Sequence, residues 1–396
     1  MTLRLILVAL HAWVGWRLGS SLAPVGAGLL GVLLVASVIV MPFGLRARRR
    51  DGSRPDLLSW TALVAMGFFS SLFVLTVLRD VVLLLVLAAD HLVSPGWTGL
   101  AAAKRMSAIA VPLAAAAITL WGFANARRTA RIAHVDVPVT DLPPPLEGFS
   151  IAQISDVHVG PTIRRPFVEA VVAAVNDLHP DMVAITGDLV DGSVTELALH
   201  VAPLGDLRSR EGTFFVTGNH EYYSGASAWV RELRRLGIRV LENEHVLLQR
   251  GDATLVLGGV TDFSAGHFDP SRASDARAAI TGSPPDAALR ILLAHQPRSA
   301  AAAEAAGFDL QLSGHTHGGQ FFPWNFFVRL QQPFTAGLHR WRRMWVYTSR
   351  GTGYWGPPKR FGAPSEITLI RLVRAPVRAA QRRPAAPLVR EGAAGL

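Results

Sequence analysis

The first third of the chain contains long apolar runs, and no other sequence feature constrains the fold as strongly. A helix needs about 20 predominantly apolar residues to cross a bilayer, and only helices and closed barrels satisfy their backbone polar groups there. Four stretches approach this length, at 3–18, 22–45, 57–78 and 106–125. The sequence therefore predicts an all-α transmembrane domain of about four helices within residues 1–130.

Two apolar segments leave alternatives. The run at 3–18 could be a signal peptide, but further apolar runs follow it without a convincing small-residue cleavage site, so we interpret it as an anchor. The run at 81–89 lies between Arg79-Asp80 and Asp90 and is too short to span a bilayer. We expect this run to extend the third helix or to lie at the membrane interface.

The distribution of charge indicates how the chain is oriented. The net charge is +10, and the basic residues cluster beside the apolar runs, as in "RARRRDGSR" (46–54), and in the C-terminal tail. Membrane flanks explain this pattern better than a nucleic-acid groove does, so nucleic acid is not an expected partner. Placing 46–54 inside predicts a multi-pass protein of the cell (inner) membrane, with the residues after 127 in the cytoplasm. If 81–89 also crossed, that part would face outward.

The sequence changes character near residue 146, where short apolar runs begin to alternate with amphipathic segments. This alternation is typical of a layered α/β domain. Residues 167–179 show helical spacing behind Pro166, and Gly251-Asp252 joins two apolar runs in a hairpin pattern. We predict an α/β domain over 148–372. It is preceded by a linker at 131–147 and followed by a basic tail at 373–396 that is expected to be disordered.

Five of the predicted strands end in a small residue followed by a polar group that can bind metal. The five motifs are Asp156-Val157-His158, Gly187-Asp188-Leu189-Val190-Asp191, Gly218-Asn219-His220-Glu221, His295, and Gly314-His315-Thr316-His317. Each motif alone is more often a turn, a cap or a surface segment. In open α/β sheets, however, ligands bind just beyond the carboxyl ends of the strands. Five such ends in one domain predict a single metal-binding site.

The number of candidate ligands indicates two ions. They comprise two carboxylates, one amide oxygen and four imidazoles: Asp156, Asp188, Asn219, His158, His295, His315 and His317. One tetrahedral zinc needs three or four ligands, so this set suits two ions that share a bridging carboxylate. Because the chain has no cysteine, mixed nitrogen and oxygen ligation favours manganese, zinc or iron. Two such ions roughly 3.5–4 Å apart can acidify a bridging water and hydrolyse a phosphate ester or anhydride.

In this order, the motifs resemble those of the calcineurin-like metallophosphoesterase superfamily, and the resemblance covers residues 148–372. The ending "YTSRGTGYWGPPKRFGAPSEITLIRL" further resembles the bacterial branch of membrane-associated phosphodiesterases and UDP-2,3-diacylglucosamine pyrophosphatase-like enzymes. The resemblance implies an α/β fold, a two-sheet β-sandwich flanked by helices.

The resemblance also implies a role for each motif residue. Asp156, His158 and His317 would hold one ion, Asn219, His295 and His315 the other, and Asp188 would bridge them. The catalytic residues would be His220 and Asp191. His220 would stabilise the transition state or protonate the leaving oxygen, and Asp191 would orient a ligand or His220.

Two further groups bear on the substrate. Arg350, Lys359 and Arg360 could neutralise a substrate phosphate or form a solvated basic loop. Phe322, Trp324 and Phe327 could pack in the core or contact acyl chains at the bilayer interface.

The function expected from the sequence is that of a membrane-anchored dinuclear-metal phosphoesterase. It would hydrolyse a phosphodiester or pyrophosphate bond of a lipid-linked or membrane-proximal substrate, by attack of a hydroxide that bridges the two ions. The alternatives are a broad phosphodiesterase acting on soluble nucleotides and a low-turnover membrane sensor of a phosphorylated ligand. The sequence indicates no protein partner.

Overall fold

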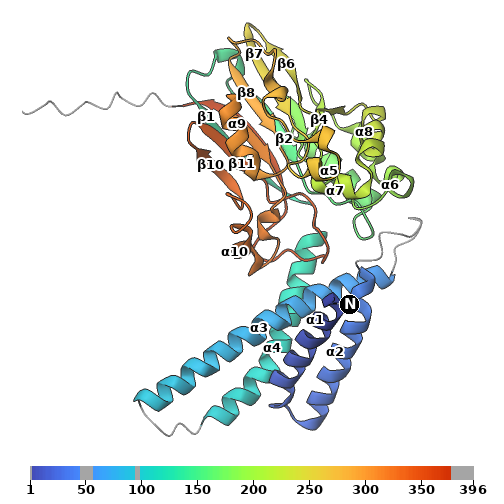
Figure 1. Cartoon of the computed structure of the whole chain (residues 1–396), viewed down its shortest axis with the longest axis vertical. Coiled ribbons are helices and arrows are strands. Elements are labelled where there is room, and N and C mark those ends of the chain that lie inside the picture. The colour runs from blue at the N-terminus through green and yellow to red at the C-terminus, as the bar shows by residue number, and fades with distance from the viewer. Residues whose placement is uncertain (1, 45–56, 94–98, 376–396) are drawn as a thin grey trace, which may run out of the picture.

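A computed structural model describes residues 2–44, 57–93 and 99–375, which form a helical bundle and a two-sheet domain (Figure 1). The basic loop at 46–54 and the tail from 376 onward lie outside the described residues.

The bundle consists of four helices, as the apolar runs predict: α1 (Thr2–Gly19), α2 (Pro24–Gly44), α3 (Leu57–Val93) and α4 (Leu100–Arg127). Its buried core includes Leu34, Phe69 and Ala115, while Val32 and Leu120 point outward and are about seven-tenths exposed, at 72% and 70%. An apolar outer surface of this kind suits lipid tails rather than water. Within the described residues, α2, α3 and α4 are long and apolar enough to cross a membrane.

Helix α3 is longer than a bilayer requires. Its 37 residues extend over about 55 Å at 1.5 Å per residue, against a hydrocarbon core of about 30 Å. The run at 81–89 therefore extends the third helix, which was one of the two expected placements. Where this extension begins, Asp80 accepts hydrogen bonds from Arg17 of α1 at 2.6 Å and from Arg79 at 3.0 Å.

The two-sheet domain is a sandwich of two six-stranded mixed sheets, as expected. The first sheet has the order β1-β12-β2-β3-β4-β5 and the second has the order β10-β11-β9-β8-β7-β6. The strands are β1 (Arg131–Val139), β2 (Ser150–Ile154), β3 (Met182–Ile185), β4 (Thr213–Phe215), β5 (Arg239–Val240), β6 (Glu244–Arg250), β7 (Ala253–Gly259), β8 (Leu289–Leu293), β9 (Leu310–Ser313), β10 (Gly337–Trp341), β11 (Met344–Thr348) and β12 (Glu366–Arg374). Ile151 of β2 and Leu312 of β9 belong to one buried cluster between the sheets.

Helices cover the outer faces of both sheets. They are α5 (Arg165–Asp177), α6 (Val194–Val201) and α8 (Ala226–Arg235) on the first sheet and α9 (Ala300–Ala306) on the second, whereas α7 (Asn219–Ser224) follows β4 and α10 (Trp324–Val328) lies at the end of the domain that faces the bundle. Val171 of α5 and Trp229 of α8 pack on the first sheet, and Ala303 of α9 packs on the second. The expected helix behind Pro166 is α5, and the expected hairpin is β6–β7, with Gly251 at φ 63° in its turn.

The segment that the sequence pattern assigns to a linker contains a strand. Residues 131–139 form β1, which pairs in parallel with β12 from Arg131↔Glu366 to Val139↔Arg374. Pro138 weakens the strand pattern in the sequence, but an edge strand tolerates a proline because one side of its backbone is unpaired. The first sheet therefore starts four residues after the end of α4, and it continues to Arg374.

Candidate metal centre

The carboxyl ends of five strands carry the seven candidate ligands. Strands β2, β3 and β4 are parallel neighbours in the first sheet, and β8 and β9 are parallel neighbours in the second. The backbone N–H of His315, after β9, donates to both carboxylate oxygens of Asp156, after β2, at 3.0 Å. This contact ties the ends of the two sheets together and brings their ligands into one site.

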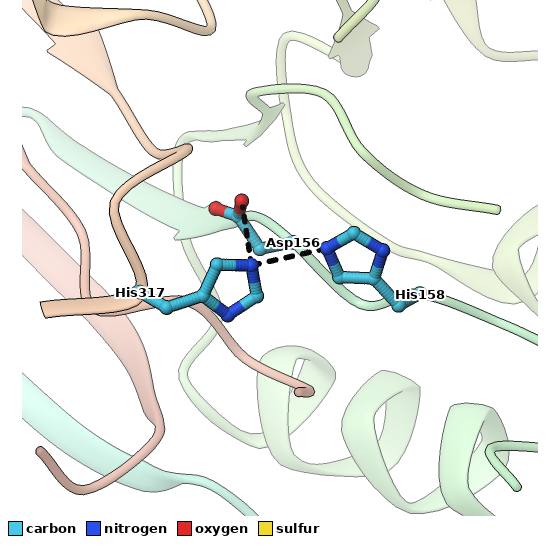
Figure 2. A group of neighbouring side chains, drawn as sticks. All are labelled: Asp156, His158 and His317. Carbon is cyan, nitrogen blue, oxygen red and sulfur yellow. Dashed lines mark hydrogen bonds and ion pairs between the residues drawn. The ribbon is translucent and has the colours of Figure 1, made fainter. Parts of the chain in front are cut away.

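The first cluster consists of Asp156, His158 and His317, whose side chains converge (Figure 2). The Nε2 atom of His317 lies 3.1 Å from Nε2 of His158 and 3.3 Å from Oδ1 of Asp156. Neighbouring ligands of one ion lie roughly 3 Å apart when each bond is near 2.1 Å. The geometry of the first cluster therefore fits one metal ion.

The second cluster consists of Asp188, His295 and His315. The Nε2 atom of His295 lies 3.1 Å from Oδ2 of Asp188 and 3.1 Å from Nδ1 of His315. The other ring nitrogen of His295, Nδ1, donates to the carbonyl oxygen of Thr186 at 2.7 Å. This bond leaves the lone pair of Nε2 free for a metal.

Asp188 connects the two clusters. Its Oδ2 atom lies 3.9 Å from Nε2 of His158 in the first cluster, as well as 3.1 Å from His295. The carboxylate of Asp188 is therefore close to histidines of both clusters.

The side chain of Asn219 provides a test of whether the site suits a cation. Its Oδ1 atom is buried and accepts no hydrogen bond from the residues that the structure describes. An unsatisfied buried acceptor destabilises a fold by about 1–3 kcal/mol. A bound cation would remove this penalty, so the orphaned oxygen fits the role of a metal ligand.

Backbone strain is concentrated at the candidate ligands. Ten described non-glycine residues have positive φ, and five of them are Asp156, His158, Asp188, His315 and His317. Asp and His tolerate this left-handed region better than most residues, but each such position costs about 1–3 kcal/mol. The rest of the fold holds these side chains in place against that strain.

Two glycines of the motifs allow the strand ends to approach closely. A Cβ atom on Gly314 would overlap the side chains of Ser155 and Asp156, and one on Gly218 would overlap Asp188. These positions need glycine because a ligand of a neighbouring strand occupies the space that any side chain would fill.

Asp191 lies between two histidines. Its Oδ1 atom accepts hydrogen bonds from Nδ1 of His158 at 3.2 Å and from Nδ1 of His220 at 2.5 Å. These bonds leave Nε2 of both rings free, and Nε2 of His220 lies 3.9 Å from Oδ2 of Asp188. Asp191, His158 and His220 also form a third group of converging side chains.

The electrostatics of the site favour a bound cation. Burial and neighbouring histidines lower the pKa of His315 to about 3 and lower that of His317 strongly, so both rings are neutral and can act as ligands. Burial raises the pKa of Asp156, whereas the histidines around Asp188 outweigh burial and hold its pKa well below the usual range. The positive charge of an ion would also stabilise the carboxylate form of Asp156.

Glu221 belongs to the motif that follows β4, but the motif gave it no role, and in the structure it supports the site. Its buried carboxyl group accepts hydrogen bonds from the backbone N–H groups of Gly218 at 2.6 Å, Asp188 at 3.0 Å and Leu189 at 2.8 Å. Burial and Asp188 raise its pKa to about 8. Glu221 is the third residue of α7, where a glutamate characteristically reaches back to the helix start, and this spacing was the available signal.

Two exposed aromatic rings beside His220 were also missed. The ring centroids of Tyr223 and Trp355 lie 5.4 and 5.7 Å from that of His220, in edge-on geometry. Both side chains remain about half exposed, at 57% and 45%. They form part of the surface next to the candidate metal centre.

The three basic residues expected near a phosphate have different environments. Arg350 donates to Glu366 at 2.9 Å and keeps a partly exposed side chain. Lys359 and Arg360 are each only 1% exposed. Of the three residues, only Arg350 remains a candidate for binding a substrate phosphate, because the side chains of Lys359 and Arg360 are buried.

Lys359 connects the domain to the bundle. Its Nζ atom donates to the carbonyl oxygen of Gly67 at 2.9 Å and to the hydroxyl of Ser71, both in α3. Burial lowers the pKa of Lys359 to about 8.

Arg360 connects α4 to the first cluster. Its backbone N–H donates to the carbonyl oxygen of Gly122 at 2.9 Å, and its guanidinium group donates to the carbonyl oxygen of His317 at 2.9 Å. The same group lies 3.2 Å from Nδ1 of the His317 ring. Arg360 therefore links His317, a candidate ligand of the first cluster, to α4, a candidate membrane-spanning helix.

The chain is similar in sequence to known metallophosphoesterases. The sequence profile of the family described as "Calcineurin-like phosphoesterase" matches residues 149–319. The "Transmembrane protein with metallophosphoesterase domain" of Bos taurus is 42% identical over 271 residues, which cover 65% of this chain and 61% of the relative. Its Danio rerio counterpart is 38% identical over 268 residues, covering 66% and 61%. An "Uncharacterized metallophosphoesterase" of Aquifex aeolicus is 34% identical over 245 residues, covering 61% of this chain and 91% of the relative.

This chain thus spans about three fifths of the length of the two vertebrate relatives, but nearly all of the Aquifex protein.

Proposed function

The chain belongs to the calcineurin-like metallophosphoesterases, and we propose that it is a membrane-anchored phosphoesterase that uses two divalent ions to hydrolyse a phosphodiester or pyrophosphate bond. One observation carries this proposal. Two clusters of three candidate ligands lie next to each other, and Asp188, a member of the second cluster, is close to histidines of both: its Oδ2 atom lies 3.1 Å from His295 of the second and 3.9 Å from His158 of the first.

In this proposal, Asp156, His158 and His317 hold one ion, Asn219, His295 and His315 hold the other, and Asp188 bridges them. When bound, manganese, zinc or iron would polarise the phosphate and lower the pKa of a water molecule.

His220 supplies the proton in this scheme. Burial opposes its protonation, but the carboxylates of Asp188 and Asp191 outweigh burial and raise its pKa. Because Asp191 holds Nδ1 at 2.5 Å, the proton on Nε2 can be donated to the leaving oxygen. The backbone N–H of His220 donates to Oδ1 of Asp188 at 2.8 Å, which fixes the ring relative to the clusters.

We propose that the bundle crosses the inner membrane and that the two-sheet domain lies in the cytoplasm. The start of α1 lies at the end of the bundle nearer the domain (Figure 1), which fits four crossings in which α1 spans in addition to the three candidate helices α2, α3 and α4. The basic loop at 46–54 joins α2 to α3, and a basic loop favours the cytoplasmic side. Fusing a reporter after Leu396 that is active on only one side of the membrane tests this orientation.

For the substrate, we favour a lipid-linked or membrane-proximal phosphodiester or pyrophosphate, because Arg360 bonds both to the candidate ligand His317 and to α4, and the neighbouring Lys359 bonds to α3. A broad phosphodiesterase acting on soluble nucleotides is the second candidate. The exposed rings of Tyr223 and Trp355 beside His220 favour it, since they offer flat faces to a base.

The test is turnover by the purified full chain with Mn²⁺. Bis(p-nitrophenyl) phosphate, p-nitrophenyl phosphate, a UDP-diacylsugar and a soluble nucleotide diester would be compared, with Asp188→Asn as the control. Faster hydrolysis of the UDP-diacylsugar supports the lipid-linked class, and faster hydrolysis of the nucleotide supports the second candidate. Binding without turnover of any of the four compounds would favour a sensor instead.

A further inference from the structure

Helix α10 and its flanks expose five large apolar side chains. These residues form the aromatic patch: Phe322, Trp324, Phe326, Phe327 and Leu330, with exposures of 47%, 44%, 64%, 53% and 81%. The rings contact one another, with centroids 5.9 Å apart for Phe322–Phe326 and 5.7 Å apart for Trp324–Phe327. Of the two sequence expectations for this segment, core packing is therefore wrong for these side chains.

The aromatic patch lies beside α3, a candidate membrane span. The indole Nε1 of Trp324 donates to the hydroxyl of Ser70 at 3.1 Å, and Ser70 belongs to α3, a candidate membrane span. Lys359 contacts α3 one residue further along, at Ser71. Helix α10 also lies at the end of the domain that faces the bundle (Figure 1). The lipid that surrounds α3 therefore borders the patch.

We propose that the aromatic patch inserts into the boundary between headgroups and acyl chains of the bilayer that holds α3. Tryptophan and phenylalanine on a short amphipathic segment are typical of such insertion. A contiguous exposed patch of this kind is unfavourable in water. Arg329, exposed at the end of α10, adds a positive charge that favours anionic headgroups.

Insertion of the patch would bring the metal centre close to the bilayer surface. Phe322 follows the candidate ligand His317 by five residues, so their Cα atoms are at most about 18 Å apart. The substrates within reach are then phosphate groups presented at the membrane surface, such as those of lipid headgroups. This consequence for the substrate rests on the proposed function, whereas insertion itself depends only on the membrane helices.

The chain contains no cysteine, so a single introduced cysteine provides one labelling site. Full-length Phe327→Cys and Leu330→Cys would each carry an environment-sensitive fluorophore in phosphatidylcholine vesicles. Both native side chains are exposed, so neither change requires repacking. The matched control is Leu247→Cys, an exposed position (45%) on β6, at the end of the domain away from the bundle (Figure 1).

Quenching by lipids brominated on the acyl chain and quenching by aqueous iodide would then be measured. We expect strong lipid quenching and little iodide quenching at 327 and 330, and the reverse at 247. If the labels at 327 and 330 respond like the label at 247, the patch does not insert. Turnover of bis(p-nitrophenyl) phosphate in the same vesicles is a separate readout. Its absence would count against the phosphoesterase proposal and leave the insertion result unaffected.

Discussion

The two clusters of the candidate metal centre resemble each other in composition but differ in their supports. In the second cluster, His295 donates to the backbone carbonyl of Thr186, the residue directly after β3 of the first sheet. In the first cluster, His158 donates to the Asp191 side chain, and His317 receives its support from Arg360. Arg360 in turn donates to Gly122 of the bundle.

This difference indicates that the two sites respond to different perturbations. The second cluster depends on the backbone carbonyl of Thr186 next to β3, and the backbone there changes little when a surface side chain is altered. The first cluster depends on the side chain of Asp191, which also bonds to His220, and on the side chain of Arg360, whose backbone bonds to the bundle. Changes at the boundary between the domain and the membrane should therefore affect the first ion before the second.

The largest effect is expected from Asp188→Asn. Its carboxylate lies near both clusters, so this nearly isosteric change should lower metal content from two ions per chain toward zero and abolish turnover. Elemental analysis of the purified protein measures the metal. Asp136→Asn, at an exposed position on β1, is the matched control. Two retained ions in Asp188→Asn would argue against a bridging role.

A pair of changes should separate the two clusters. His317→Ala should empty mainly the first site and His315→Ala mainly the second, so each protein should retain about one ion and nearly lose activity. Metal titration of the two variants, side by side, makes each the control of the other. Loss of both ions in each variant would show that the clusters bind metal only together.

His220→Ala should keep the metal and lose turnover. Removing a positioned general acid lowers a rate by roughly 10²–10⁴-fold, and His220 takes its orientation from Asp191 at 2.5 Å. Steady-state rates with bis(p-nitrophenyl) phosphate and elemental analysis, beside the exposed control His134→Ala, test both statements. Near-normal turnover would remove His220 from the mechanism.

The smallest of the four effects is expected from Arg360→Met, which keeps the length of the side chain but removes the support of His317. Loss of a group that orients a ligand typically lowers metal affinity or activity by about 10–100-fold. Only one of the two Mn²⁺ binding steps should shift in calorimetry. Arg371→Met, a half-exposed arginine on β12, serves as control. An equal shift of both steps would contradict the difference between the clusters.

Much of the fold could be predicted from local sequence patterns. The four bundle helices follow from the length of the apolar runs, and α5 follows from apolar spacing behind Pro166, because these signals are contained within one element. Strand β1 was missed because its pairing partner, β12, begins more than two hundred residues later. Nothing local to residues 131–139 indicates that distant partner.

The seven candidate ligands could be identified from the sequence because their motifs are local. The residues that support them could not, because their contacts come from distant parts of the chain. Each ligand follows its own strand in the sequence, so the motif is local. Glu221, Tyr223 and Trp355 become significant only through the groups that they contact in space. Lys359 and Arg360 were expected to neutralise a phosphate or to lie in a solvated loop, because a basic pair in a loop gives no sign that it will be buried against α3 and α4.

The sequence by itself determined the apolar helices, the order of the strands along the chain and the residue types that end them, since each depends on neighbours a few positions away. Only the tertiary structure decided which ligands share a cluster, because His158 and His317 are brought within 3.1 Å by the packing of two sheets. It also decided that Trp324 lies against Ser70 of α3. Contacts between distant segments depend on the summed packing of the whole molecule, which no single stretch of sequence encodes.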